Sequence, residues 1–102
     1  LEIDVIATLP QNILLLNNYP NPFNPTTFIP IEMKNRENII IEIFDIGGGL
    51  VKTIFNGLLE EGVHTFIWNG KGNDGLEIGS GVYFYTVKSN NVFLSKKIVF
   101  AK

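Results

Sequence analysis

Hydrophobic and polar residues alternate along most of this chain with a period of two, which is typical of strands that bury one face. In the segment "NIIIEIFDI", residues 38–46, Ile39, Ile41 and Ile43 fall on one face and Glu42 on the other. Clusters of Gly, Asn and Asp separate such segments, and no stretch of ten or more residues has helical periodicity. The pattern predicts strands at 13–18, 27–33, 38–46, 50–57, 62–70, 81–89 and 92–100.

Individual residues predict where some of these strands lie in a sheet. Pro30 has no N–H to donate, so we expect the strand at 27–33 to lie at an edge. The density of β-branched residues at 38–46 favours a central strand. The last two segments should pair as an antiparallel hairpin across Asn90 and Asn91.

Length and composition fit one globular domain. The chain has 102 residues, of which 45% are hydrophobic and 18% charged, and it has no cysteine. We therefore predict an all-β fold, an immunoglobulin-like antiparallel β-sandwich of about seven strands without a disulfide. Because the chain begins with Leu1 rather than Met, we interpret residues 1–12 as a linker from the upstream part of a larger protein and 13–102 as the domain. No apolar run is long enough for a transmembrane segment.

Charge and histidine content argue against several functions. The net charge is −2 and Arg36 is the single arginine, which disfavours a nucleic-acid partner. The one histidine, His64, lies within an alternating strand pattern and has no nearby Ser or Asp in a catalytic arrangement. "GGG" at 47–49 precedes a strand rather than a helix, so it lacks the geometry of a phosphate loop. We therefore expect a protein that is not an enzyme and has no cofactor.

Two weaker candidate sites also have structural explanations. Asn69, Asn73 and Asp74 in "NGKGNDG" are weak calcium candidates, but only Asp74 carries a full negative charge, and local turn hydrogen bonds explain the composition equally well. Trp68, Tyr83 and Tyr85 could form a sugar-binding platform, although their positions favour packing in the core.

The segment "NYPNPFNPTT", residues 18–27, differs from the rest of the chain. Its three prolines fix φ and remove N–H donors, so the segment cannot lie in a central strand. We expect a stiff connector that crosses from one sheet to the other, with Tyr19 and Phe23 packed on the sandwich and the Asn side chains bonded to nearby backbone.

Four segments carry a family resemblance: "NYPNPFNPTT", "IFDIGGGLVKTI", "GVHTFIWNGKGNDGLEIGSGVYFYTV" and "KKIVFAK". In this order they resemble the C-terminal sorting domain (type A) of the type IX secretion system, and the resemblance covers residues 17–102. One position departs from that family, whose central turn usually contains Gly-Arg, because Gly48 is followed here by Gly49. The second half also resembles the immunoglobulin-like domain of flagellar hook-capping proteins.

The resemblance implies a non-catalytic secretion signal at the end of a larger protein. Such a domain directs its upstream cargo domain through the periplasm to the type IX outer-membrane translocon, and in many members a sortase-like protease then removes it. The cargo is accordingly secreted or held at the cell surface. The residues that match the motifs, and are thus candidates for translocon recognition, are Tyr19, Pro20, Asn21, Pro22, Phe23, Gly48, Gly81, Val82, Tyr83, Lys96, Lys97 and Lys102.

Other interpretations stay open at this point. The terminal lysines could instead protect an edge strand. The whole domain could be a structural or adhesive spacer of immunoglobulin or fibronectin type, or a carbohydrate-binding module of a secreted enzyme.

Overall fold

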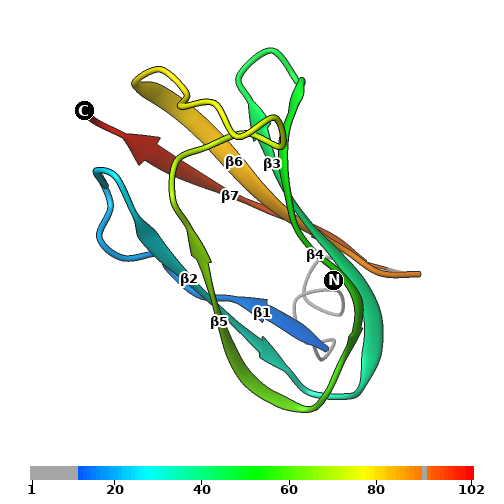
Figure 1. The fold of residues 1–102 in the computed structure, drawn as a ribbon. Helices are drawn as coiled ribbons and strands as arrows, with labels where there is room; N and C mark the ends of the chain where they lie inside the picture. The colour runs from blue at the N-terminus through cyan, green and yellow to red at the C-terminus, as the bar shows by residue number, and fades with distance from the viewer. Residues whose placement is uncertain (1–11, 91) are drawn as a thin grey trace, which may run out of the picture.

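The computed structural model describes residues 12–90 and 92–102, which form two antiparallel sheets packed face to face (Figure 1). The strands are β1 (Ile13–Leu15), β2 (Thr27–Met33), β3 (Glu37–Asp45), β4 (Leu50–Leu59), β5 (Gly62–Trp68), β6 (Gly81–Lys88) and β7 (Phe93–Phe100). One sheet has the order β1-β2-β5 and the other β4-β3-β6-β7. The predicted immunoglobulin-like sandwich of seven strands is therefore confirmed.

The core between the sheets comes from alternate residues of the central strands. On β2 and β3, the buried isoleucines and methionine are Ile29, Ile31, Met33, Ile39, Ile41 and Ile43. Burying each such side chain stabilises the fold by about 1.5–3 kcal/mol. The largest fully buried side chains are Trp68 and Tyr85, one from each sheet. The period-two pattern thus places one face of each sheet in a shared core.

Contrary to the edge position predicted from Pro30, β2 is the central strand of its sheet. The Pro30 carbonyl accepts the N–H of Leu16 at 3.1 Å, so both backbone groups of Pro30 point toward β1. The reciprocal bond is impossible because proline has no N–H. The Leu16 carbonyl instead accepts the hydroxyl of Tyr85, which reaches across the core from β6. A side chain of the opposite sheet thus supplies the donor that Pro30 lacks.

The other strand predictions fare better. β3 is central in its sheet, as predicted. β6 and β7 form the expected hairpin, and the N–H of Ser89 donates to the carbonyl of Val92 at 2.9 Å, while Asn91 lies outside the described residues. β4 continues to Leu59, two residues beyond the predicted end.

Two further expectations concern the ends of the chain and the membrane. Apart from Asn12, the predicted linker at 1–12 lies outside the described residues. Within 12–90 and 92–102, no helix has the length and hydrophobicity to cross a membrane.

The proline-rich segment does not cross between sheets. It leaves β1 and returns to β2, and these two strands are neighbours in one sheet. Its tip nevertheless contacts the other sheet, because Phe23 forms a parallel bridge with Phe100 at the end of β7. The expected crossover is therefore a loop within one sheet that is tied to the edge of the second.

Candidate functional site

Several loops gather at one end of the sandwich, which we call the loop end (Figure 1). It comprises the β1–β2 loop at 16–26, the β3–β4 turn at 46–49, the β5–β6 loop at 69–80 and the terminal residues 101–102. The strand register brings these loops together, since Asp45 pairs with Tyr83 and Gly81 pairs with Phe100. The loop end therefore joins segments from both halves of the chain.

Backbone hydrogen bonds fasten the proline-rich loop to β7. The N–H of Phe23 donates to the carbonyl of Val99, and the N–H of Ala101 donates to the carbonyl of Phe23, both at 3.0 Å. The Asn21 side-chain oxygen accepts the N–H of Val99 at 3.0 Å. These bonds accompany the isolated parallel bridge between Phe23 and Phe100, so the loop occupies backbone groups that the edge strand β7 would otherwise leave open.

Buried polar side chains close the base of the same loop. The Asn18 side-chain amide donates to Thr27 Oγ1 at 2.9 Å, and the Thr27 hydroxyl donates to the carbonyl of Pro20 at 2.9 Å. Tyr19 and Phe28 exchange two backbone hydrogen bonds, of 3.0 and 2.8 Å. The loop is thus held at its base and its tip, and its exposed residues keep a fixed arrangement.

Aromatic packing connects the loop to the core. The ring centroid of Phe23 lies 5.3 Å from that of Trp68 and 4.8 Å from that of Phe100. Trp68 in turn makes an edge contact with Tyr83, with centroids 5.8 Å apart. Trp68, Tyr83 and Tyr85 are all buried, as the core-packing interpretation requires, so these three residues form no exposed platform for a sugar ring.

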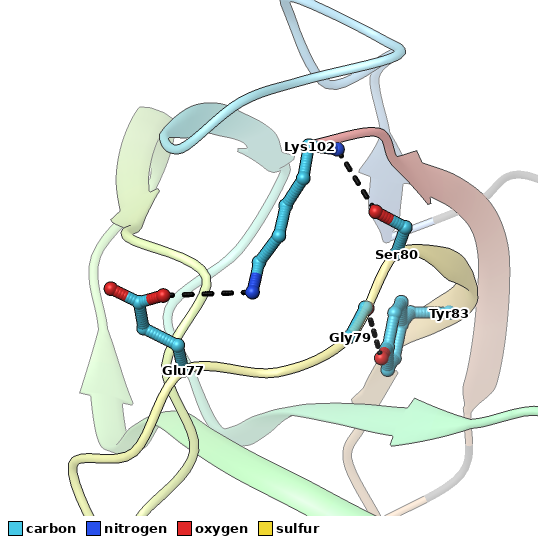
Figure 2. Close-up of polar contacts among 5 residues, drawn as sticks. All are labelled: Glu77, Gly79, Ser80, Tyr83 and Lys102. Atoms are coloured by element: carbon cyan, nitrogen blue, oxygen red, sulfur yellow. Dashed lines mark hydrogen bonds and ion pairs between the residues drawn. The ribbon is translucent and has the colours of Figure 1, made fainter.

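The last residue of the chain is bonded to the loop that leads into β6 (Figure 2). The backbone N–H of Lys102 donates to Ser80 Oγ at 3.0 Å, and Lys102 Nζ lies 3.5 Å from Glu77 Oε1. The ion pair is exposed and contributes little on its own. The Tyr83 hydroxyl donates to the carbonyl of Gly79 at 2.7 Å. Burial raises the pKa of Tyr83, and the neighbouring Asp45 carboxylate raises it further.

A carboxylate organises the glycine turn between β3 and β4. Asp45 Oδ1 accepts the N–H groups of Gly47 at 3.0 Å and Gly49 at 2.8 Å. Gly48 has φ of 89°, which a residue with a side chain rarely adopts. A Cβ at position 49 would lie 3.0 Å from Asp45 Oδ2. Gly49, where the sorting family usually has arginine, therefore lets the Asp45 carboxylate close the turn.

The weak calcium candidates each bond to a different backbone N–H. Asn69 Oδ1 accepts from Lys71 at 3.1 Å, Asn73 Oδ1 from Thr53 at 3.0 Å, and Asp74 Oδ1 from Leu76 at 2.9 Å. In the described part of the chain, no group of three or more His, Asp or Glu side chains could hold a metal ion. These oxygens shape the β5–β6 loop, which is the alternative that the sequence left open.

The motif residues divide into two groups in space. The loop end brings together Tyr19, Pro20, Asn21, Pro22, Phe23, Gly48, Gly81, Val82, Tyr83 and Lys102. Lys96 and Lys97 lie further along β7, opposite Tyr85 and Phe84. Within the first group Phe23 and Tyr83 are buried, whereas Tyr19, Pro20 and Pro22 are exposed.

Sequence reasoning did not single out several residues that build this end. Asn18, Thr27, Asp45 and Ser80 hold loops in place through side-chain hydrogen bonds. The sequence contains a weak indication of this role, because Asn, Asp, Ser and Thr next to Pro or Gly favour hydrogen bonds from their side chains to the backbone.

Gly70 lies where the β5–β6 loop meets the proline-rich loop. Its φ is 75°, and a Cβ there would lie 2.9 Å from the carbonyl oxygen of Pro25. We expect Gly70→Ala to lower the free energy of unfolding by about 1.5 kcal/mol, measured by urea denaturation. Gly75→Ala is the matched control, because Gly75 has a similar φ of 82° and nothing lies within 4 Å of a Cβ at that position. Equal stability of the two variants would contradict this account of the contact.

Comparison with known proteins identifies relatives in flagellar and secretion systems. The family model described as the FlgD Ig-like domain matches residues 29–92. The basal-body rod modification protein FlgD of Salmonella typhimurium is 34% identical over 67 residues, which cover 65% of this chain and 29% of that protein. The FlgD of Salmonella typhi gives the same values. The chain therefore spans under a third of the length of these curated relatives.

Two solved structures from Porphyromonas gingivalis share the fold. Dimeric latent PorU superposes with a TM-score of 0.70 at 23% identity, over 91% of this chain and 10% of that one. PorZ, described as an essential bacterial surface component of the type IX secretion system, gives a TM-score of 0.57 at 22% identity, over 84% and 11%. At these identities the likeness shows the immunoglobulin-like fold alone. The family match covers more than half of the chain, which thus belongs to the family of FlgD Ig-like domains.

Proposed function

We propose that this domain is a non-catalytic export signal that directs an attached cargo to the translocon of a type IX secretion system. The observation that carries the proposal is the bonding of the proline-rich loop to the end of the chain. Through Phe23, Val99 and Ala101, the two motif segments that are furthest apart in sequence form one surface. A receptor can therefore recognise both segments together at the loop end, and a sortase-like protease can act afterwards.

The exposed groups of this surface suit recognition. Tyr19, Pro20 and Pro22 are exposed on a loop that hydrogen bonds hold at its base and its tip. A preorganised surface binds without a large cost of ordering its side chains and backbone. The absence of catalysis is also part of the proposal. His64 supports it, because its Nε2 lies 2.7 Å from the carbonyl oxygen of Glu60. This contact is at the opposite end of β5 from the loop end.

The solved structures add support for a secretion role. PorZ is described as a surface component of the type IX secretion system, and most of this chain superposes on part of it. Secretion across the outer membrane, or retention at the cell surface, would follow for the cargo.

A structural spacer is the second candidate function. The family match and the 34% identity to FlgD, a basal-body rod modification protein, favour it. A spacer would hold neighbouring parts of its parent protein or assembly apart, and its removal would leave export unchanged. The carbohydrate-binding alternative has no such support, because its three aromatic candidates are buried.

A reporter fusion tests the first proposal against the second. The 102-residue chain is joined to the C-terminus of a periplasmic fluorescent protein in cells with a working type IX system. We expect reporter in the medium or at the cell surface, and retention in the periplasm when the translocon is disabled. Retention in the competent cells, with the domain shown to be folded by circular dichroism, would favour the spacer.

Charge reversal on β7 tests whether its lysines belong to the recognised surface. No acidic residue follows Glu77, so the end of the chain is positively charged. We expect the double change Lys96→Glu and Lys97→Glu to reduce export about tenfold, because repulsion replaces attraction at the receptor. Lys97 is exposed but Lys96 is half-buried, so thermal melts must show that the double variant is folded before its export is compared.

Lys88→Glu is the control, because Lys88 is exposed at the far end of β6. It should leave export unchanged. Normal export of the double variant would return Lys96 and Lys97 to the role of protecting the edge of β7.

A further inference from the structure

The four edge strands of the sandwich differ in how they are covered. β7 carries the parallel bridge to Phe23. On β4, the carbonyl of Val51 accepts the N–H of Asn73 and the N–H of Thr53 donates to Asn73 Oδ1, at 2.9 and 3.0 Å. β1 is only three residues long. These are the usual ways in which proteins prevent an edge from pairing with another chain.

Among residues 12–90 and 92–102, nothing protects β5 in these ways. In β2, the backbone groups of even-numbered residues point to the side of β1, as the hydrogen bonds of Phe28 and Pro30 show. The backbone groups of odd-numbered residues therefore point to β5. Their partners in the register are the even-numbered residues of β5. The backbone groups of Val63, Thr65 and Ile67 therefore point away from the sheet. No turn or loop backbone among residues 12–90 and 92–102 bonds to them.

The side chains on this edge are also exposed and uncharged. Val63 and Ile67 are each 61% exposed, and Thr65 between them is exposed as well. The segment 62–68 contains no charged residue and no proline, and its register with β2 runs without a bulge. A regular, apolar, unbonded edge of this kind is a site for the addition of a further strand.

We propose that β5 pairs with β5 of a second copy of this chain, antiparallel about a two-fold axis at Thr65. In this register Val63 of each copy lies opposite Ile67 of the other, and the two Thr65 residues face each other. All the outward N–H and C=O groups of Val63, Thr65 and Ile67 then bond across the interface. The two three-stranded sheets become one sheet of six strands.

The side chains favour a copy of the same strand over an unrelated one. Outer-face pairs of Val63 with Ile67, and of the two Thr65 residues, are β-branched pairs that stabilise antiparallel ladders. Glu61 precedes the strand and Lys71 follows it, and both are exposed. Antiparallel pairing about Thr65 places Glu61 of one copy opposite Asn69 of the other, two residues from Lys71, so residues of opposite charge flank each end of the interface.

Sedimentation of the full chain from micromolar to millimolar concentration tests this dimer. We expect a reversible monomer–dimer equilibrium for the parent chain. Thr65→Lys should weaken dimerisation at least about tenfold, because two ammonium groups meet at the axis. Thr65→Asp should do the same, and an equimolar mixture of the two variants should restore the dimer.

Leu58→Lys is the matched control, since Leu58 is 50% exposed on β4 and lies outside the proposed interface. It should dimerise like the parent chain. Thermal melts of all variants confirm that each is folded. A parent chain that stays monomeric at every concentration, or a Thr65→Lys variant that dimerises like the parent, would overturn the proposal.

Amide hydrogen exchange tests the register itself. With rising concentration, exchange should slow at Val63, Thr65 and Ile67, while His64 and Phe66 already bond to β2 and should change little. A dimer in which these three amides do not slow uses another interface. If the chain stays monomeric and the β5 amides are protected from exchange only when another protein is added, that protein is the partner of β5. Each of these two results would refute self-pairing.

Discussion

Phe23→Ala is expected to lower the free energy of unfolding by about 3–5 kcal/mol, measured by urea denaturation. Phe23 is 1% exposed and packs against Trp68 and Phe100, so its removal leaves a cavity that the rigid sheets cannot close. The change should also loosen the loop and the end of the chain together. Hydrogen exchange at the amide of Ala101, which donates to the Phe23 carbonyl, should accelerate.

Tyr19→Ala is the control within the same motif. Tyr19 is 54% exposed and its ring contacts Phe28, with centroids 5.4 Å apart. Its loss should cost about 0.5–1 kcal/mol. Similar destabilisation by the two changes would contradict the division of the loop into buried and exposed aromatic residues.

The same pair of variants separates stability from recognition. If Tyr19→Ala reduces export of the reporter while the domain stays folded, the exposed ring belongs to the recognised surface. Phe23→Ala should reduce export only through loss of the folded fraction, so a lower temperature should partly restore it.

The sandwich could be predicted because its signals are local. The alternation at β3 fixes which residues face the core, and the spacing of turn residues fixes the number of strands. The β6–β7 hairpin joins strands that are adjacent in sequence, so its register follows from the short connection. None of these inferences depends on which strand lies next to which across the molecule.

The incorrect predictions concern contacts between distant residues. Pro30 indicated an edge because the rule considers only the strand's own donors, whereas the Tyr85 hydroxyl, far away in sequence, supplies the missing bond. The stiffness of the proline-rich loop is visible in the sequence but its end point is not, so the predicted change of sheet is wrong. Here β1 pairs with β2, and only the bridge at Phe23 reaches the second sheet.

The candidate site could be predicted only in part, because it too depends on contacts between residues that are distant in sequence. Motif residues at 19–23, 81–83 and 102 could be nominated one by one, but their meeting at the loop end depends on the pairing of Gly81 with Phe100 and of Phe23 with Phe100. The exposed edge of β5 could not be found from sequence, because alternation shows which face of a strand is buried and not whether a second strand lies beside it.

Tyr85→Phe is expected to lower the free energy of unfolding by about 2 kcal/mol, because the Leu16 carbonyl loses its donor while the core keeps its shape. Pro30→Val is the second change needed for a double-mutant cycle, because valine restores a backbone N–H opposite the Leu16 carbonyl. In a double-mutant cycle, Tyr85→Phe should cost at least about 0.5 kcal/mol less when position 30 is valine. Tyr83→Phe is the control, as its hydroxyl bonds to Gly79 and should be additive with Pro30→Val. If the losses in free energy of unfolding from Tyr85→Phe and Pro30→Val simply add, the Tyr85 hydroxyl does not replace the N–H that Pro30 lacks.

The pH dependence of stability gives an independent check on the same hydroxyl. Burial raises the pKa of Tyr85 above the ordinary tyrosine value of 10.0, so the folded state keeps the proton after the unfolded state has begun to lose it. The folded chain then binds more protons than the unfolded chain above that pH, and its stability must fall as pH rises. Tyr85→Phe removes this titrating group. Denaturation midpoints measured between neutral pH and the alkaline range should therefore converge for the parent and the variant, because the parent loses a contribution that the variant never had. A constant gap between the two chains at every pH would mean that Tyr85 ionises alike in the folded and unfolded states, which would contradict the effect of its burial.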